Sequence, residues 1–304
     1  MPSSKGVRFL HRELRGYRLY RLFFILPFLL YIAFLQTNLA KVYTRLFDKE
    51  PNEILFLLGF MAPLHTGFLL VCAGVYCFLY WLKSPFFERF KTNDLPWPWE
   101  SNRAAFFSNL PNCIKRYLIN QFVISSFILW CLKPIFPLNG DPNDLPSLPT
   151  VFLQIFFSLI CEDFLFYWSH RALHSQLLYS RIHKIHHEYP NVFYLSAVNA
   201  HWLEYILSNL APLMLGPFVL GPKMHKVTFY TWTMFRVTES HEVHSGYSFP
   251  WSIFQWYPLS TDSAYHNFHH VKTNQNFATF FFFWDSVFGT NRDYVAEVLD
   301  SNTK

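Results

Sequence analysis

The chain has 304 residues, of which only 15% are charged, whereas 21% are aromatic and 36 residues are Phe. A water-soluble domain normally has about a quarter of its residues charged, so this composition excludes an ordinary soluble protein and predicts that lipid solvates much of the exterior. The net charge of +5 is concentrated in residues 1–21, which hold six Lys or Arg and one Glu.

Residues 1–21 form a basic arm directly before an apolar run. Cations in this position mark the cytosolic end of a membrane helix more often than a nucleic-acid contact, so no nucleic-acid partner is expected. The apolar run has no small-residue cleavage site, which favours a retained anchor over a signal peptide.

Four apolar segments are each about as long as a bilayer-spanning helix. They are residues 22–40, 54–82, 117–138 and 151–169. A further apolar stretch, 202–236, is broken by Pro and Gly, which predicts a hairpin that dips into the membrane and returns on the same side. The predicted fold is therefore an all-α integral membrane protein, with a cytosolic helical cap on the four transmembrane helices. No repeat or linker divides residues 22–304, which are expected to form a single domain.

The loops between the spans predict the orientation. Basic residues collect before the first span and in 83–116, whereas loop 139–150 has none and two Asp. Because Lys and Arg are enriched on the cytosolic side, both basic segments are placed there. Four crossings then return the chain to the cytosol near residue 170, where the histidine-rich region 170–290 begins.

Ten of the fourteen histidines occur in four short groups. They are HRALH (His170, His174), HKIHH (His183, His186, His187), HEVH (His241, His244) and HNFHH (His266, His269, His270). Spacings of three and four place side chains on one face of a helix, close enough to share a metal. Ten neighbouring cations would repel one another in a pH switch, whereas neutral imidazoles around a metal avoid that repulsion. A metal centre is therefore favoured.

The number of imidazoles also predicts how many ions are bound. A zinc site is saturated by about four ligands, so ten histidines suit two metals of higher coordination with positions left for O₂. Nitrogen ligands alone are compatible with iron, copper or zinc. Four carboxylates near the groups could orient the rings by accepting their second N–H, although for Asp163 simple polarity at the membrane edge is equally open. These residues are Glu162, Asp163, Glu239 and Asp262.

Three further residues have a different expected role. His201 and Trp202, in NAHWLE, follow the second group and are candidates for facing the substrate. His65 lies within an apolar run, where a hydrogen bond between helices is favoured over metal ligation.

The order HRALH, HKIHHEY, HEVHSGYSFPW and HNFHH resembles the fatty acid hydroxylase superfamily of membrane di-iron enzymes. Within it, the sequence is most similar to the sterol oxidase branch that includes C4-methylsterol monooxygenases. Four sequence motifs, which lie between roughly residues 90 and 290, are similar to those of that branch. They are PWPWE (96–100), CEDFLFYWSHRALH (161–174), HSGY (244–247) and NFATFFFFWDSVFGT (276–290).

The resemblance implies two iron ions held by the ten histidines, with no further catalytic residue, and O₂ as the co-substrate. The implied reaction is oxidation of an unactivated C–H bond of a sterol at its C4-methyl group, in the endoplasmic reticulum. The chain has neither a GxGxxG nor an HPGG haem motif, so it is expected to bind no nucleotide or haem of its own. Electrons would come from an external cytochrome b5 or an NAD(P)H-dependent reductase.

The family's His-Pro-x-Glu pattern is replaced here by His201-Trp202-Leu203-Glu204. The oxidised carbon therefore stays open. Side-chain hydroxylation, dealkylation, desaturation and hydroxylation of another lipid are the enzymatic alternatives. A membrane metal transporter or metal-storage protein is the non-enzymatic one, and it is disfavoured because transporters bind their ions near the bilayer midplane.

Overall fold

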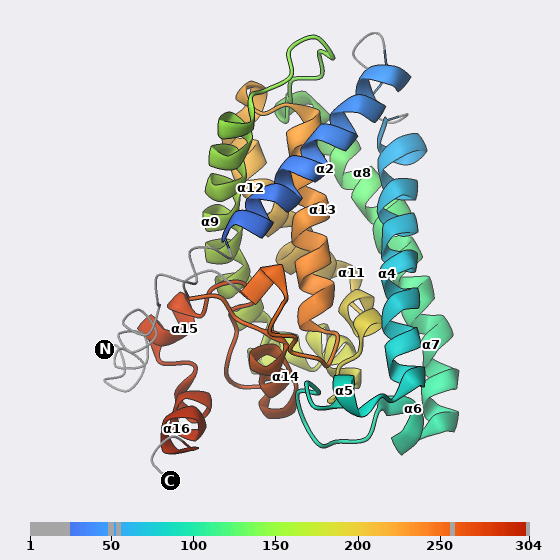
Figure 1. The fold of residues 1–304 in the computed structure, drawn as a ribbon, viewed down its shortest axis with the longest axis vertical. Coiled ribbons are helices and arrows are strands. Elements are labelled where there is room, and N and C mark those ends of the chain that lie inside the picture. Colours follow the sequence, from blue (N-terminus) through green and yellow to red (C-terminus); the bar gives the residue numbers. More distant parts are fainter. Residues whose placement is uncertain (1–24, 48–51, 53–55, 256–258, 302–304) are drawn as a thin grey trace.

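The computed structural model describes residues 25–47, 52, 56–255 and 259–301. Among these residues the chain forms helices and connecting loops, with isolated β-bridges but no strand (Figure 1). The all-α fold expected from the sequence is confirmed. The basic arm 1–21 lies outside the described residues.

Among the residues that the structure describes, seven helices and three π-helical turns form the main bundle. The helices are α2 (Ile25–Leu46), α4 (Ala62–Leu82), α7 (Arg103–Leu118), α8 (Ser125–Leu132), α9 (Leu148–Leu173), α12 (Ala211–Leu220) and α13 (Lys226–Val243), and the π-turns are η2 (Leu57–Met61), η3 (Ile119–Ile124) and η7 (Tyr205–Leu210). The other α-helices are α5 (Pro85–Glu88), α6 (Pro98–Ser101), α10 (Gln176–Tyr179), α11 (Trp202–Glu204), α14 (Ser263–Lys272), α15 (Phe283–Phe288) and α16 (Arg292–Ser301). Short 3₁₀ segments are η4 (Lys133–Ile135), η5 (His183–Glu188), η6 (Tyr194–Val198), η8 (Gly221–Lys223) and η9 (Ile253–Gln255).

In the described part of the chain, five helical stretches are long and apolar enough to cross a membrane. They are Ile25–Leu46, Gly59–Leu82, Arg103–Ile135, Leu148–Leu173 and Trp202–Lys223. The first four correspond to the four predicted spans, although the third begins well before residue 117. The fifth stretch corresponds to the first half of the predicted hairpin. This half is longer than the sequence suggested. The protein is an integral membrane protein.

A π-helical turn explains why Pro212 does not end this fifth stretch. Pro212 has no N–H, and its ring would clash with the carbonyl four residues earlier in a regular α-helix. The turn η7 comes directly before it, and the Ala211 N–H bonds to the Ile206 carbonyl, five residues back. This wider turn accommodates the proline, so Trp202–Lys223 continues as one helical stretch.

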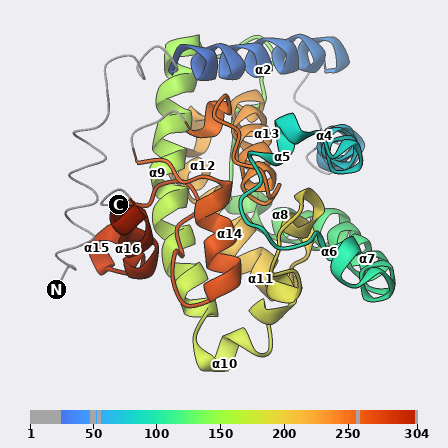
Figure 2. The same cartoon turned by 60° about the horizontal axis from the view of Figure 1, so that its bottom comes forward.

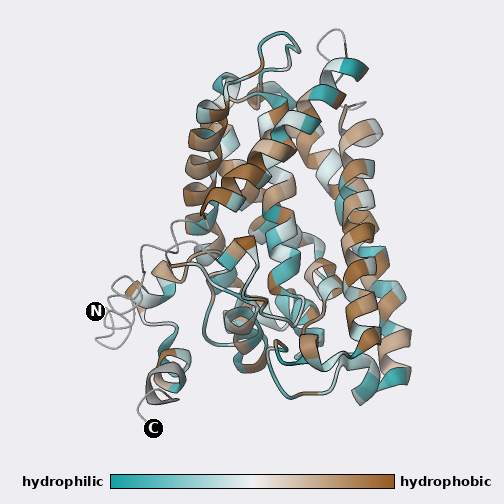
Figure 3. Cartoon of the chain, viewed as in Figure 1, coloured by the Kyte–Doolittle hydropathy of each residue, from teal (hydrophilic) through white to brown (hydrophobic). Residues whose placement is uncertain are grey.

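Apolar side chains cover the outside of the bundle. Figure 3 shows the apolar colour along α4 and α9, where Trp81 is 76% exposed and Leu153 is 71% exposed. Large apolar side chains facing outward in such numbers are typical of a surface solvated by lipid.

The histidine groups lie together at one end of the bundle. Helices α9 and α13 pack against each other, and their C-terminal ends carry the first and third groups. The turn η5 and helix α14 supply the other two groups at the same end (Figure 1). In Figure 2, which brings this end forward, α14 lies next to α9.

Gly216 sets the distance between α12 and α9. A Cβ atom at this position would lie 2.4 Å from the Ser158 Cα, so the two backbones approach as closely as small residues allow.

We expect Gly216→Ala to lower the thermal stability of the purified protein by about 1–3 kcal/mol, because a main-chain atom cannot move aside. Gly74→Ala is the matched control, since its added Cβ meets nothing within 4 Å. Equal melting temperatures for the two variants would contradict this packing.

Candidate metal centre

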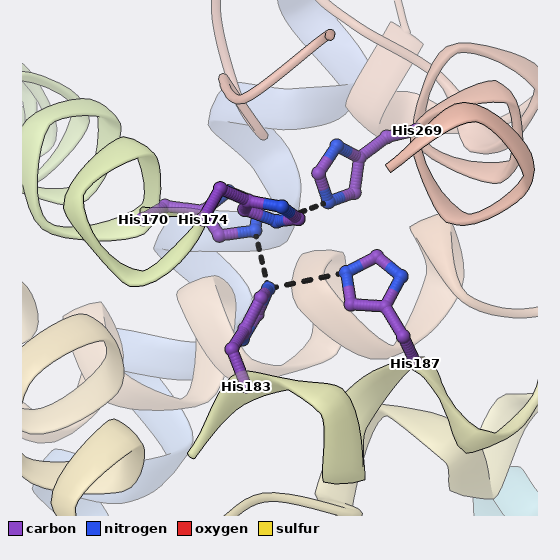
Figure 4. A group of neighbouring side chains, drawn as sticks. All are labelled: His170, His174, His183, His187 and His269. Atoms are coloured by element: carbon purple, nitrogen blue, oxygen red, sulfur yellow. Dashed lines mark hydrogen bonds between the residues drawn. The ribbon is translucent and has the colours of Figure 1, made fainter. Parts of the chain in front are cut away.

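Five histidines form the first group, and their side chains point toward one another from α9, η5 and α14 (Figure 4). One ring nitrogen from each lies within 4.8 Å of the others. The members are His170, His174, His183, His187 and His269. The His183 Nε2 atom is 3.1 Å from Nε2 of both His170 and His187, and the His174 and His269 Nε2 atoms are also 3.1 Å apart.

Four further histidines form the second group, which is fully buried. It consists of His186, His244, His266 and His270. The His244 Nε2 atom lies 3.2 Å from that of His186 and 2.8 Å from that of His266, which is in turn 3.2 Å from the His270 Nε2 atom.

Hydrogen bonds to the backbone fix the tautomers of several rings. The Nδ1–H groups of His170, His269 and His244 donate to the carbonyls of Phe277, Gln275 and Ser240 at 2.7, 2.6 and 2.6 Å. A neutral imidazole has one N–H, so each of these Nε2 atoms carries a lone pair directed into its group.

Lone pairs facing one another at about 3 Å repel unless a cation lies between them. Two nitrogens that bind one metal at about 2.1 Å, roughly at right angles, are themselves about 3 Å apart. The observed Nε2 separations of 2.8–3.2 Å match that spacing in both groups. The residues present therefore fit two metal ions, one for each group.

Burial keeps these rings neutral. It lowers the pKa of His186 to about 3, and it holds the pKa of His183, His266 and His270 well below the usual value. Neighbouring imidazoles lower these pKa values further, because two adjacent imidazolium ions repel. A neutral ring is the form that binds a metal.

The local backbone divides each HxxHH motif between the two groups. His183 and His187 belong to the first group, whereas His186 belongs to the second. Likewise His269 of α14 faces the first group and its neighbour His270 the second. Adjacent residues on a helical turn point in different directions, so each triplet contributes to both groups. Spacings of three and four therefore do not bring all three rings of a triplet to one metal group.

Of the ten histidines expected as ligands, nine enter the two groups and His241 does not. His241 and His244 are three residues apart on α13, yet only His244 turns into the second group. The His241 Nδ1–H donates to the Val237 carbonyl at 2.7 Å, and its ring lies 5.3 Å from that of Tyr194.

The four carboxylates expected to orient the rings lie elsewhere. Glu162 and Glu239 pair with the buried guanidinium of Arg236, at 2.8 Å in the case of Glu162. Asp163 accepts the Phe281 N–H at 3.0 Å, and Asp262 caps α14. Within the described residues, none of the four bonds to a ring of either group.

The two residues expected to face the substrate lie toward the surface. The His201 Nδ1 atom accepts the Leu203 N–H at 3.2 Å and caps α11, and the Trp202 side chain is 47% exposed. Neither residue is among those that line the cavity described below.

Glu204 is the carboxylate that sequence reasoning missed. Its Oε1 atom lies 2.9 Å from the His183 Nδ1 atom, and both side chains are buried. A carboxylate at this distance favours the tautomer of His183 whose Nε2 lone pair faces the first group. One signal was available, because Glu204 is the only acidic residue between Glu188 and Glu239.

Asp285 is a second missed residue, and it acts through the backbone. Its carboxylate accepts the N–H groups of Phe277 and Ala278 at 3.0 and 2.7 Å and the Tyr265 hydroxyl at 2.9 Å. These bonds hold the segment whose Phe277 carbonyl orients His170. Burial raises the pKa of Asp285 to about 6, although its donors oppose that shift.

The PWPWE motif packs against the loop that follows His244. Gly246 has a φ of +73°, and a Cβ there would lie 2.7 Å from the Trp97 ring and 2.8 Å from the Val192 carbonyl. Trp97 is buried among Tyr80, Tyr247 and other aromatic rings. The glycine therefore lets the HSGY loop pack directly on the indole.

An interhelical cavity adjoins the metal centre. Its apolar lining includes Met61, Leu129, Leu213 and Phe229. It shares five lining residues with the space beside the rings of His170, His183, His186, His244 and His266, namely Phe166, Ala197, Ser208, Asn209 and Ser240. A long apolar molecule in this cavity would therefore present one end to the metal groups.

Residues 155–290 match the family model described as fatty acid hydroxylase. Methylsterol monooxygenase 2-2 of Arabidopsis thaliana is 37% identical over 187 residues, which cover 60% of this chain and 69% of that protein. A very-long-chain aldehyde decarbonylase of rice, Oryza sativa subsp. indica, is 36% identical over 62% of this chain and 73% of its own length. The C-4 methylsterol oxidase of Schizosaccharomyces pombe is 31% identical over 69% of each chain. No solved structure matches the chain.

Proposed function

Since this chain belongs to the fatty acid hydroxylase family of oxidoreductases, we propose that it is an O₂-dependent sterol oxidase acting on the C4-methyl group of a 4-methylsterol. The observation that carries the proposal is the pair of buried histidine groups beside an apolar interhelical cavity. Residues 22–304 would act as one oxygenase domain.

The nine clustered histidines are the proposed ligands of two iron ions. Five rings in one group and four in the other leave positions open at six-coordinate metals. When bound, iron would supply the O₂ chemistry that oxidises an unactivated C–H bond, which no side-chain acid or base can do. The chain itself holds the rings neutral, and its burial of both groups excludes water from the reacting atoms.

The cavity supports a rigid lipid as the substrate. Most of its lining comes from the membrane spans and from α13, so the cavity suits a molecule dissolved in the membrane. Methylsterol monooxygenases are similar to this chain over 60% and 62% of its length. Both facts favour a sterol over a soluble substrate.

Orientation and electron supply complete the proposal. The histidine groups lie at the same end of the bundle as the basic segment 83–116, and this supports a cytosolic orientation of the groups at the endoplasmic reticulum membrane. There an external cytochrome b5 or NAD(P)H-dependent reductase would deliver electrons.

Deleting the gene and profiling the lipids tests this function. We expect 4-methylsterols to accumulate and their demethylated products to fall, with restoration by the intact gene. Because several similar rice proteins are named aldehyde decarbonylases, long-chain aldehydes and alkanes should be measured in the same extracts. Unchanged 4-methylsterols with accumulated aldehydes would replace the sterol assignment with aldehyde chemistry.

A further inference from the structure

Two buried histidines outside both metal groups line the interhelical cavity. His65 lies on α4 and His241 on α13, and their side chains are 8% and 6% exposed. The two rings thus place polar nitrogens on the wall of one cavity, whose lining is largely apolar. Buried polar atoms are normally satisfied, so this pair calls for a partner.

The hydrogen bonding of His241 defines what it can bind. Its Nδ1–H donates to the Val237 carbonyl, so the Nε2 atom carries a lone pair, and among the described residues this atom has no partner. Burial lowers the pKa of His241 to about 4, which keeps the ring neutral. The free position on His241 is therefore an acceptor that needs a donor.

His65 supplies the complementary capability. Neither of its ring nitrogens has a hydrogen-bond partner of normal geometry in the described part of the chain, although Gln121 lies beside it. A neutral imidazole can donate from one nitrogen, so His65 can donate where His241 accepts. A hydroxyl group satisfies both rings at once, because it donates one hydrogen and accepts another.

We infer that His65 and His241 bind a hydroxyl group of the lipid substrate, whose O–H donates to the His241 Nε2 atom and whose oxygen accepts from His65. This inference rests on the proposed function, and it adds the chemical group that the cavity recognises. A ketone or an ether could accept from His65 but could not donate to His241.

The position of His241 also limits which carbon is oxidised. His241 is three residues from His244 of the second metal group, or about 4.5 Å along the axis of α13. A hydroxyl bound there holds the carbon atoms next to it close to the metals. The 3-hydroxyl of a sterol lies on the carbon adjacent to C4, so its capture presents the C4-methyl group rather than the distant side chain.

Equilibrium binding to the metal-loaded protein, with no electron donor present, tests the inference without turnover. The probes are a 4-methylsterol and its 3-ketone, which keeps the acceptor oxygen but has no O–H. We expect the wild-type protein to bind the alcohol about tenfold more tightly, as one hydrogen bond with a buried acceptor allows. His241→Leu should abolish this preference, and His241→Gln, which keeps an acceptor, should restore much of it.

Two further variants separate recognition from general damage. His65→Leu should weaken both probes together, because it removes the donor that both oxygens use. Thr233→Val is the matched control, since Thr233 lines the same cavity but its hydroxyl already donates to the Phe229 carbonyl at 2.9 Å. The Thr233→Val variant should prefer the alcohol over the ketone as strongly as the wild type does.

The outcomes are distinct. If His241→Leu keeps the tenfold preference, or if the wild type shows none, the hydroxyl is not recognised here and a water molecule satisfies the pair. If His241→Leu loses bound metal, His241 is a ligand and the inference is also overturned. Binding of neither probe by the wild type would overturn the sterol assignment together with it.

Discussion

Replacing His183 with Ala is expected to reduce sterol oxidation by more than about 100-fold, since even residues that only support a metal ligand typically contribute 10–100-fold. His183 lies at the centre of the first group, with its Nε2 atom 3.1 Å from those of His170 and His187. Removing it leaves neighbouring lone pairs without a shared cation. Metal analysis of the purified variant should show less than the two ions per chain expected of the wild type.

His201→Ala is the matched control for this substitution. His201 is a histidine of the same region, but it lies outside both groups and caps α11. The metal content of the His201→Ala variant should equal that of the wild type. Full activity in His183→Ala, or equal metal loss in both variants, would contradict the assignment of the first group.

Glu204→Gln is expected to lower metal affinity or activity by about 10–100-fold while preserving the fold. The carboxylate lies 2.9 Å from the His183 Nδ1 atom, and glutamine has nearly the same shape but no charge. The weaker acceptor makes the ring a poorer ligand and lets it adopt other orientations. Titration of the metal-free protein with Fe²⁺, together with turnover at saturating sterol, measures both effects.

Glu188→Gln makes the same chemical change one residue after His187. Glu188 pairs with Arg116 at 3.2 Å on a partly exposed surface, so its loss should leave Fe²⁺ affinity unchanged. If Glu204→Gln and Glu188→Gln behave alike, the contact between Glu204 and His183 has no part in metal binding.

The spans and the histidine end of the bundle could be predicted because hydropathy and spacing are local properties of the chain. Four apolar segments became helices, and basic residues indicated that 83–116 and the histidines share one end. The fifth stretch was underestimated because Pro212 looks like a helix break. Whether a π-turn precedes a proline depends on packing that the sequence pattern does not reveal.

The division of the ligands could not be read from spacing alone. A three-and-four pattern places His183, His186 and His187 on one turn, but it does not say which metal each faces. That choice depends on how η5 docks between α9 and α14. For the same reason His241 looked equivalent to His244, although only His244 enters a group.

The groups that orient the rings were also beyond sequence reasoning. Carboxylates near the motifs in sequence were the natural candidates, yet Glu162 and Glu239 neutralise Arg236 instead. Backbone carbonyls of Phe277 and Gln275 orient His170 and His269. Every residue has a carbonyl, so no pattern of residue types indicates which one accepts a bond.

One measurement tests the central claim most directly. The metal-loaded protein, an NAD(P)H-dependent electron donor and a 4-methylsterol are incubated under ¹⁸O₂, and the sterol products are analysed by mass spectrometry. We expect ¹⁸O in a new oxygen function on the C4-methyl carbon, with none in products of the His183→Ala variant. Oxidation at another carbon, or a C4 product without ¹⁸O, would contradict the proposed function.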